Sequence, residues 1–285
     1  MEKLILAKEG VFPVIKDHNG KHINDKPQTG FHFAGTIQGE GKLSGVPSLF
    51  VRLSSCNLRC IWQMKDGSFC QGDTTYASFH PNQVMELTVQ QLFDWIKHNL
   101  GHLKHVVITG GEPLLQKKAL ATLCQRLKEE LQVHITLETN GTLFDPEVAQ
   151  WVDLFSLSPK LSNSSPTPEK LSAYDLKEAG PLIYHNEKRI NLKALQAYID
   201  LTNTTDKDLQ LKFVVGKQDD DKEIKSDFLQ HLNNWNNNDI LLMPLGATHE
   251  QIAQSSPLAL EMAITNAWRY SPRIHIDLFG SKSGV

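Results

Sequence analysis

Short runs of apolar residues recur along the chain and predict buried β-strands. Several runs are apolar at consecutive positions, which is typical of strands covered on both faces of a sheet. The predicted strands span residues 48–53, 105–109, 133–137, 154–157, 209–215, 240–243 and 273–278.

Helical periodicity separates many of these runs. Thr88 and Gln91 form a capping box, and an apolar stripe with the spacing of a helix follows them. Similar patterns predict helices around residues 120–127, 188–201 and 248–269. Because strands that alternate with helices build parallel βαβ units, we expect an α/β fold with a parallel sheet or barrel.

The first 30 residues do not follow this alternation. The turn-forming run from Asp17 to Gly20 lies between two apolar stretches and predicts a small hairpin. We therefore expect an N-terminal appendage over residues 1–30 and a core domain over residues 31–285.

Composition narrows the class of protein. Of 285 residues, 40% are hydrophobic and 21% are charged, which excludes a mainly disordered chain. A net charge of −3 predicts neither direct nucleic-acid binding nor an anionic-membrane surface. No apolar run approaches the roughly 20 residues of a membrane helix, and the charged N-terminus lacks a secretory segment. We expect a soluble, cytoplasmic protein.

Three of the four cysteines cluster just after the first core strand. Cys56, Cys60 and Cys70 could bind three irons of a [4Fe–4S] cluster and leave the fourth iron without a protein ligand. A structural zinc site is the alternative, with His80 as the nearby fourth ligand. Cys124 lies on an apolar helical stripe and is expected in the core.

Two glycine-containing segments could contact a ligand. The run from Thr109 to Pro113 follows a predicted strand, its two glycines let the backbone approach a ligand, and Glu112 could accept from an amine. The run from Gln38 to Gly41 lacks the dinucleotide-binding spacing and leads into a strand. We expect it to be a flexible, polar loop that covers a substrate.

Further polar residues follow predicted strands and would lie at the same end of a parallel sheet. These are the segments 138–142 and 158–160. Asp73 and Thr74 supply oxygen ligands suited to Mg²⁺ near the thiols. Arg52 lies on the first core strand and would bind a carboxylate if it points inward.

Together these motifs resemble the radical S-adenosylmethionine enzymes, and more closely the 7-carboxy-7-deazaguanine synthases of queuosine biosynthesis. The resemblance covers roughly residues 30–160, with weaker similarity further on, and is carried by the runs that begin at Gln38, Pro47, Cys56, Asp73, Thr109, Glu138 and Ser158. One departure is the third cysteine. Nine residues separate Cys60 from Cys70, and Gln71 and Gly72 intervene before Asp73.

The resemblance implies an open, partial TIM-like barrel with about six core parallel strands. It also implies a role for individual residues. The implied cluster ligands are Cys56, Cys60 and Cys70, and the implied Mg²⁺ ligand is Thr74. The implied substrate contacts are Ile37, Gln38, Gly39, Arg52 and Thr109. The implied S-adenosylmethionine contacts are Gly111, Glu138, Ser158, Pro159 and Lys160.

The implied reaction is the radical ring contraction of 6-carboxy-5,6,7,8-tetrahydropterin to 7-carboxy-7-deazaguanine with loss of ammonia. The family also implies an electron donor such as flavodoxin and a homodimer. Two alternatives share part of the pattern. One is a radical S-adenosylmethionine activase that acts on a glycine of a partner protein, and the other is a zinc-stabilised binding module.

Overall fold

The computed structural model describes residues 2–72, 74–79 and 83–285. Within them, ten strands form one sheet in the order β12-β11-β10-β9-β8-β7-β3-β1-β6, with β2 paired to β3. The strands are β1 (Lys3–Phe12), β2 (Thr36–Ile37), β3 (Pro47–Leu53), β6 (Met85–Thr88), β7 (His105–Gly110), β8 (His134–Thr139), β9 (Leu154–Leu157), β10 (Asp208–Val215), β11 (Ile240–Pro244) and β12 (Arg269–Tyr270). A separate hairpin consists of β4 (Trp62–Gln63) and β5 (Phe69–Cys70).

The central part of the sheet is parallel. β3, β7, β8, β9, β10 and β11 pair with one another in parallel, in this order. The order runs from one edge strand to the other, so within the described residues the sheet does not close on itself. This confirms the predicted open barrel with about six core parallel strands.

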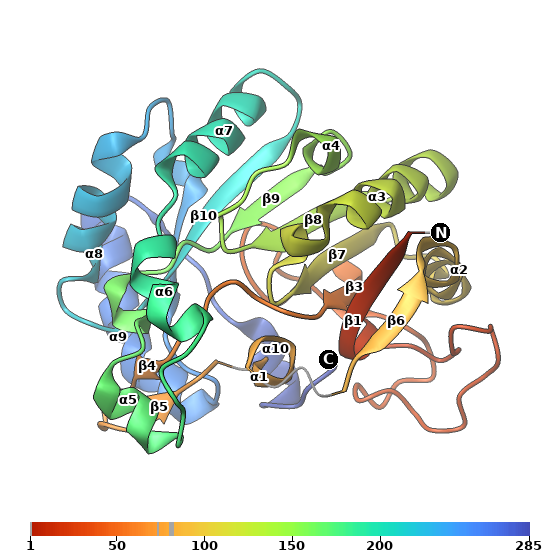
Figure 1. The fold of residues 1–285 in the computed structure, drawn as a ribbon, viewed down its shortest axis with the longest axis horizontal. Helices are drawn as coiled ribbons and strands as arrows, with labels where there is room; N and C mark the ends of the chain where they lie inside the picture. The colour runs from red at the N-terminus through yellow and green to blue at the C-terminus, as the bar shows by residue number, and fades with distance from the viewer. Residues whose placement is uncertain (1, 73, 80–82) are drawn as a thin grey trace.

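Helices cover the outer side of this sheet. Figure 1 shows α2, α3, α4 and α7 along one side of the fanned strands. The helices are α1 (Thr75–Ser78), α2 (Val89–Leu100), α3 (Lys117–Leu131), α4 (Pro146–Ala149), α5 (Pro168–Ala173), α6 (Pro181–Lys188), α7 (Leu192–Asn203), α8 (Asp220–Glu223), α9 (His249–Asn266) and α10 (Ile274–Phe279). In the described part of the chain, no helix is long and apolar enough to span a membrane.

Local sequence signals explain why several elements begin where they do. The predicted capping box is present: Thr88 Oγ1 accepts from the backbone of Gln91, and the Gln91 side chain accepts from the backbone of Thr88. β7, β9 and β11 are buried along nearly their whole length, which explains their continuous apolar runs. Cys124 is fully buried in the core, as its helical stripe predicts.

Two expectations need correction. β1 pairs antiparallel with both β3 and β6, so residues 3–12 belong to the main sheet and not to an appendage. The predicted small hairpin does form, with a bridge between Lys16 and His22. The predicted strand at 273–278 is instead the helix α10. A six-residue segment is too short for its apolar pattern to distinguish the period of a strand from that of a helix. Only Ile276 is buried in α10, so burial imposes no repeating pattern on this segment.

Candidate active site

One cavity of about 330 Å³ lies at the C-terminal ends of the parallel strands. Nearly all the residues singled out from the sequence line it. They are Ile37, Gln38, Gly39, Arg52, Cys56, Cys60, Cys70, Thr74, Thr109, Gly111, Glu138, Ser158 and Lys160. Pro159 is buried and is not among the described residues that line the cavity. Segments separated by more than 100 positions in the sequence therefore meet at one site.

The segment that carries the first two cysteines is held by side-chain hydrogen bonds to its backbone and its neighbours. Arg59 Nη1 donates to the carbonyl oxygen of Cys56 at 2.6 Å. Asn140 Nδ2 donates to Asn57 Oδ1 at 2.8 Å, and Asn57 Nδ2 donates to Thr142 Oγ1 at 2.8 Å. The loop after β8 therefore fixes the loop after β3, and both face the cavity.

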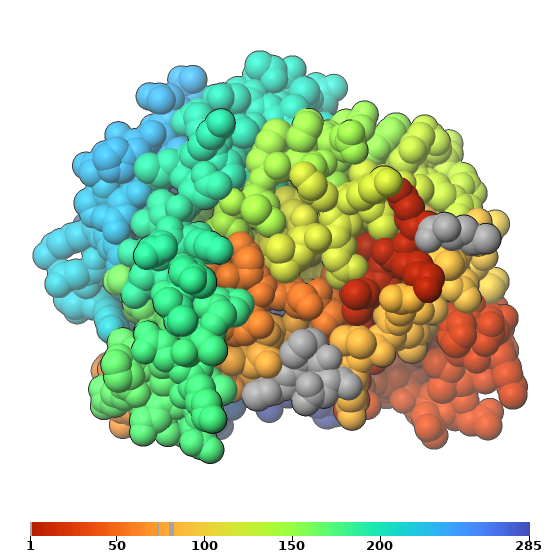
Figure 2. Space-filling view, in the orientation of Figure 1, coloured from red at the N-terminus to blue at the C-terminus, as the bar shows by residue number. Residues whose placement is uncertain are grey.

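The residues between Cys60 and Cys70 form a hairpin. Trp62 lies opposite Cys70 in its register, and Asp66 forms the turn by accepting from the backbone of Ser68 at 2.9 Å. The hairpin reverses the chain, so Cys70 returns to a position beside Trp62, two residues after Cys60. Figure 1 shows the β4–β5 hairpin beside α5, and Figure 2 shows orange atoms of the segment that follows β3 between the green atoms of the α5–α6 region and the yellow atoms of the β7–β8 region.

Burial makes the thiols poor acids in the protein alone. It raises the pKa of Cys60 to about 12 and also raises the pKa of Cys56, because a thiolate loses hydration there. The nearby charge of Lys160 acts in the opposite direction on both thiols. Among the described residues, no three His, Cys, Asp or Glu side chains form a group that could hold a single metal ion. The expected ligands Asp73 and His80 lie outside the described residues.

Glu112 has a different surrounding from the one expected. It is fully buried, and its carboxylate accepts from the Thr139 hydroxyl at 2.8 Å and from the backbone of Asn140 at 2.9 Å. Glu112 also accepts from the backbone of Leu114 and so caps the short 3-10 helix Pro113–Gln116. Burial raises the pKa of Glu112. Glu112 therefore braces the loops after β7 and β8, and it is not among the described residues that line the cavity.

The two glycines after β7 serve packing as well as access. A Cβ at Gly110 would lie 2.0 Å from the carbonyl oxygen of Leu53, and Gly110 has a φ of +143°. A Cβ at Gly111 would lie 2.0 Å from the carbonyl oxygen of Ser55. Any side chain here would push apart the ends of β3 and β7, where the cysteine segment begins.

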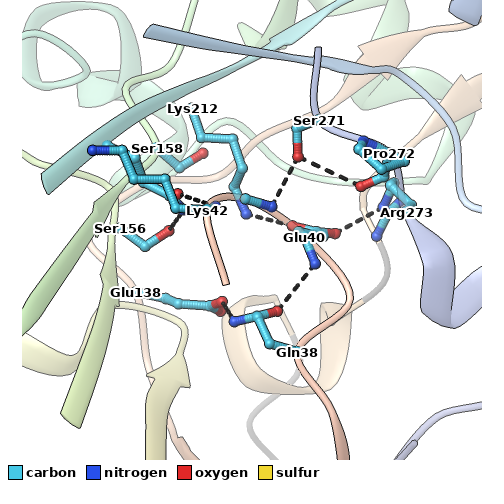
Figure 3. A network of polar contacts seen from close by, with 12 residues as sticks. Gln38, Glu40, Lys42, Glu138, Ser156, Ser158, Lys212, Ser271, Pro272 and Arg273 are labelled. Atoms are coloured by element: carbon cyan, nitrogen blue, oxygen red, sulfur yellow. Dashed lines mark hydrogen bonds and ion pairs between the residues drawn. The ribbon is translucent and has the colours of Figure 1, made fainter. Parts of the chain in front are cut away.

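The loop from Gln38 to Lys42 is fixed by polar contacts, which corrects the expectation of a flexible cover. Glu40 accepts from Lys212 and, at 2.8 Å, from Arg273 Nε. Lys42 Nζ donates to Asp208 at 2.7 Å and to Asp239 at 2.6 Å. Figure 3 shows the contacts of Glu40, which reach the loop from Lys212 on β10 and from Arg273 just before α10. The loop thus links β2 and β3 to the far part of the open sheet.

Burial alone would raise the pKa of Glu40, but the charges of Lys212 and Arg273 outweigh it and hold that pKa well below its usual range. Burial would likewise lower the pKa of Lys212, yet Glu40 and Glu138 raise it. The carboxylate and the ammonium are therefore both charged at neutral pH, inside the protein.

Two further contacts organise the cavity wall. Gln38 Nε2 donates to Glu138 Oε1 at 3.0 Å, which joins the loop to the end of β8 (Figure 3). Lys160 Nζ donates to the carbonyl and the hydroxyl oxygen of Ser158, both at 2.7 Å. Burial lowers the pKa of Lys160.

Arg52 points into the cavity and not to solvent. Its Nε donates to Glu9 Oε2 at 3.0 Å, and its guanidinium carbon lies 4.8 Å from the ring centroid of Phe12. The inward option for Arg52, left open by the sequence, is therefore the one observed.

Sequence reasoning missed several residues that line the cavity. Lys212, Arg273 and His275 come from the C-terminal third of the chain, as does the segment 243–247 after β11. Lys212 carried a usable signal, because a lysine inside an apolar strand run must find a partner if it is buried. Tyr76 and Glu40 also contribute, and their positions depend on distant contacts.

Comparison with known proteins identifies the class. A sequence model of the Radical SAM superfamily matches residues 52–155, from Arg52 through the cysteine segment to β9. The fold is also similar to the crystal structure of QueE from Escherichia coli, with a TM-score of 0.53 at 22% identity over 92% of this chain and 93% of that one.

Full-length relatives identify the family. The chain is 38% identical over 249 residues to the 7-carboxy-7-deazaguanine synthase of Halobacterium salinarum, covering 86% of this chain and 87% of the relative. It is 36% identical over 249 residues to the 7-carboxy-7-deazaguanine synthase of Rhodopirellula baltica, covering 87% and 85%. The chain belongs to the 7-carboxy-7-deazaguanine synthase family of radical S-adenosylmethionine enzymes. This membership confirms the predicted family and favours it over the activase and the zinc-stabilised module.

Proposed function

We propose that the protein converts 6-carboxy-5,6,7,8-tetrahydropterin to 7-carboxy-7-deazaguanine, with ring contraction and loss of ammonia, as a lyase of queuosine biosynthesis. The observation that carries the proposal is the shared cavity. It brings together three cysteine side chains, an inward arginine and polar ends of several parallel strands. Family membership supports the same reaction.

Cys56, Cys60 and Cys70 would hold a [4Fe–4S] cluster through their thiolates. Three thiolates on a loop beside the cavity suit a cluster with one open iron. Asn140 Nδ2 and the backbone of Leu58 both approach Cys56 Sγ, at 3.9 and 3.4 Å, and would stabilise a thiolate there. The hairpin supports Cys70 as the third ligand. Nine residues separate Cys60 from Cys70, but the antiparallel pairing of β4 and β5 reverses the chain and returns Cys70 to a position opposite Trp62.

When bound, the cluster and S-adenosylmethionine supply a 5′-deoxyadenosyl radical that abstracts hydrogen. The chain would bind S-adenosylmethionine through Gly111, Glu138 and the segment from Ser158 through Pro159 to Lys160. The Glu138 carboxylate and the Lys160 ammonium are of opposite charge, which suits the amino and carboxylate groups of this ligand. Walls around these groups would exclude water from the radical.

The pterin would lie between the loop Ile37–Gln38–Gly39 and the ends of β3 and β7. Arg52 would bind its carboxylate, and Thr109 would contact the ring. Thr74 would provide one oxygen ligand for Mg²⁺, with substrate oxygens and waters as the others. Among the described residues the Thr74 side chain makes no capping hydrogen bond to α1, so its hydroxyl is not committed to that role.

Three wider features belong to the same proposal. The electron would come from a small donor protein such as flavodoxin. The enzyme would work in the cytoplasm as a homodimer. It would act on the small-molecule pterin and would not contact nucleic acid directly.

The test is anaerobic turnover. Reconstituted protein is incubated with dithionite, S-adenosylmethionine, Mg²⁺ and 6-carboxy-5,6,7,8-tetrahydropterin, and the products are identified by mass. We expect 7-carboxy-7-deazaguanine and 5′-deoxyadenosine from the unmodified protein and neither from Cys56→Ala. Formation of 5′-deoxyadenosine without the deazaguanine, in the presence of substrate, would contradict the proposed substrate.

A further inference from the structure

Glu9 is a largely buried carboxylate that the proposed reaction does not use. It lies on β1 and its side chain is only 13% exposed, next to the Arg52 side chain at 14%. Its Oε2 accepts from Arg52 Nε at 3.0 Å and from the Tyr76 hydroxyl at 2.5 Å. Its Oε1 accepts from the Ser283 hydroxyl. Three other chain segments thus donate to one carboxylate.

Two aromatic rings also lie near the Arg52 guanidinium. Its central carbon lies 4.8 Å from the centroid of Phe12 and 5.9 Å from that of Tyr76. Stacking of this kind restricts a guanidinium to one plane, and a carboxylate at Nε then sets its rotation within that plane. An arginine carries five N–H donors, and the bond to Glu9 uses the one on Nε.

Glu9 approaches Arg52 from behind, as seen from the main cavity. Arg52 lines that cavity, whereas Glu9 is among the described residues that line a second cavity and not the first. The described residues that line both cavities are Phe12, Tyr76, Lys282, Ser283 and Gly284. A pterin in the main cavity would meet the guanidinium first, and Glu9 would remain on its far side.

We propose that Glu9 is a positioning residue that orients the Arg52 guanidinium for the carboxylate of the pterin. This inference rests on the proposed function, in which Arg52 binds that carboxylate. A long, flexible arginine side chain loses rotamer freedom when it binds a ligand, and a side chain that is already oriented loses less. Glu9 would therefore raise the affinity for pterins that carry the carboxylate and leave affinity for other pterins unchanged.

The opposite effect is also physically reasonable, and the two can be separated. Glu9 carries a negative charge near the site of a negatively charged group, so it could instead compete with the substrate for Arg52. Glu9→Gln removes the charge but keeps an oxygen that can accept from Arg52 and Tyr76. Glu9→Ala removes both. Orientation predicts weaker binding only for Glu9→Ala, whereas competition predicts tighter binding for both variants.

The experiment measures equilibrium binding by anaerobic calorimetry, with the full chain, its cluster reconstituted and S-adenosylmethionine present, but without reductant. The two probes are 6-carboxy-5,6,7,8-tetrahydropterin and tetrahydropterin without the carboxylate. We expect Glu9→Ala to bind the carboxylated pterin roughly 2- to 12-fold more weakly, the range expected for ordering one long side chain. Glu9→Gln should bind it at least as tightly as the unmodified protein. Neither variant should change binding of the plain pterin.

Three further variants make the result decisive. Glu86→Ala, on β6, breaks an exposed ion pair with Lys3, which lies on β1 as Glu9 does. This control should change neither affinity. Glu9→Ala combined with Arg52→Ala should bind no more weakly than Arg52→Ala alone. Tyr76→Phe removes one donor to Glu9 without removing the carboxylate. It should cause a smaller loss of affinity, only for the carboxylated pterin, and it replaces Glu9→Ala as the test if that variant does not fold.

The failures are distinguishable. If Arg52→Ala leaves affinity for the carboxylated pterin unchanged, the proposed carboxylate contact is wrong. If Arg52→Ala weakens binding but Glu9→Ala does not, or if Glu9→Ala weakens both pterins equally, the positioning role of Glu9 is overturned.

Discussion

Two loops form facing walls of the same cavity, and they are held in opposite ways. The loop from Gln38 to Lys42 is fixed by buried ion pairs that reach across the open sheet to Lys212 and Arg273. The cysteine segment, residues 54–72, makes no ion pair among its described residues and is fixed by hydrogen bonds to amide and carbonyl groups, two of them from Arg59 and Lys170, and by a short hairpin. The charged wall contains its own counter-ions, whereas the thiols become anionic only when a metal centre compensates them.

The comparison shows how stability and chemistry are divided between the walls. Substitutions that break the ion pairs of the loop 38–42, the charged wall, should lower the free energy of unfolding. Substitutions of the cysteines in the segment 54–72, the cysteine wall, should prevent cofactor binding and leave the fold largely intact.

The largest expected effect is loss of the cluster. Cys56→Ala, Cys60→Ala and Cys70→Ala should each abolish cluster assembly, because three protein ligands are the minimum for this kind of site. Iron content and visible absorbance after anaerobic reconstitution measure this. Cys124→Ala is the control and should keep its cluster, since Cys124 is buried in the core. Retention of the cluster in Cys70→Ala would show that another group is the third ligand.

The next effect concerns the charged wall. Glu40→Ala leaves Lys212 and Arg273 buried without their carboxylate and should lower the free energy of unfolding by about 3–5 kcal/mol. Lys222→Ala breaks an exposed pair with Asp219 and should lower the free energy of unfolding far less, because solvent screens exposed charges. Urea unfolding of the apoprotein compares the two. Equal midpoints would mean that the buried pairs do not stabilise the loop.

The same pair predicts a pH dependence. The pKa of Glu40 lies below its ordinary value of 4.5, so its stabilisation is present above that value. It should be lost as pH falls through the lower, folded-state pKa. The stability difference between the unmodified protein and Glu40→Gln should therefore be constant near neutral pH and shrink in acid. A difference that grows in acid would contradict the assignment of the charge to Glu40.

A smaller effect is expected at Arg52, which lies on β3 and would bind the substrate carboxylate. Arg52→Ala removes a charge-assisted hydrogen bond of roughly 1.5–3 kcal/mol. It should weaken binding of the carboxylated pterin about 10- to 100-fold without changing iron content. Calorimetry and iron analysis on the same sample separate the two readouts. A parallel loss of iron would place Arg52 in the support of the cysteine segment.

The smallest effect is expected at Thr74, on the cysteine side. Thr74→Val keeps the shape but removes the hydroxyl oxygen that would bind Mg²⁺. It should reduce the stimulation of turnover by Mg²⁺ and leave the cluster intact. Turnover at several Mg²⁺ concentrations is the measurement, with Thr74→Ser as the variant that keeps the oxygen. An undiminished response in Thr74→Val would move the metal role to another residue.

The sequence by itself determined the class of fold and predicted a cluster at its three neighbouring cysteines, with a zinc site as the alternative. Consecutive apolar positions predicted β3, β7 and β9 correctly, because strands buried on both faces tolerate few polar residues. The capping box marked the start of α2, and the cysteine spacing pointed to a cluster. These signals are local, and local sequence encodes them directly.

Tertiary structure decided which residues meet. β1 looked like part of an appendage because an isolated strand carries no sign of its partners, and only pairing with β3 and β6 reveals its place. Glu112 looked available to a ligand until the loop after β8 was seen to satisfy it. Glu9 and Arg52 are 43 positions apart, and Glu40 and Arg273 are 233 apart. Such pairs depend on the order and curvature of the sheet, which no local periodicity specifies.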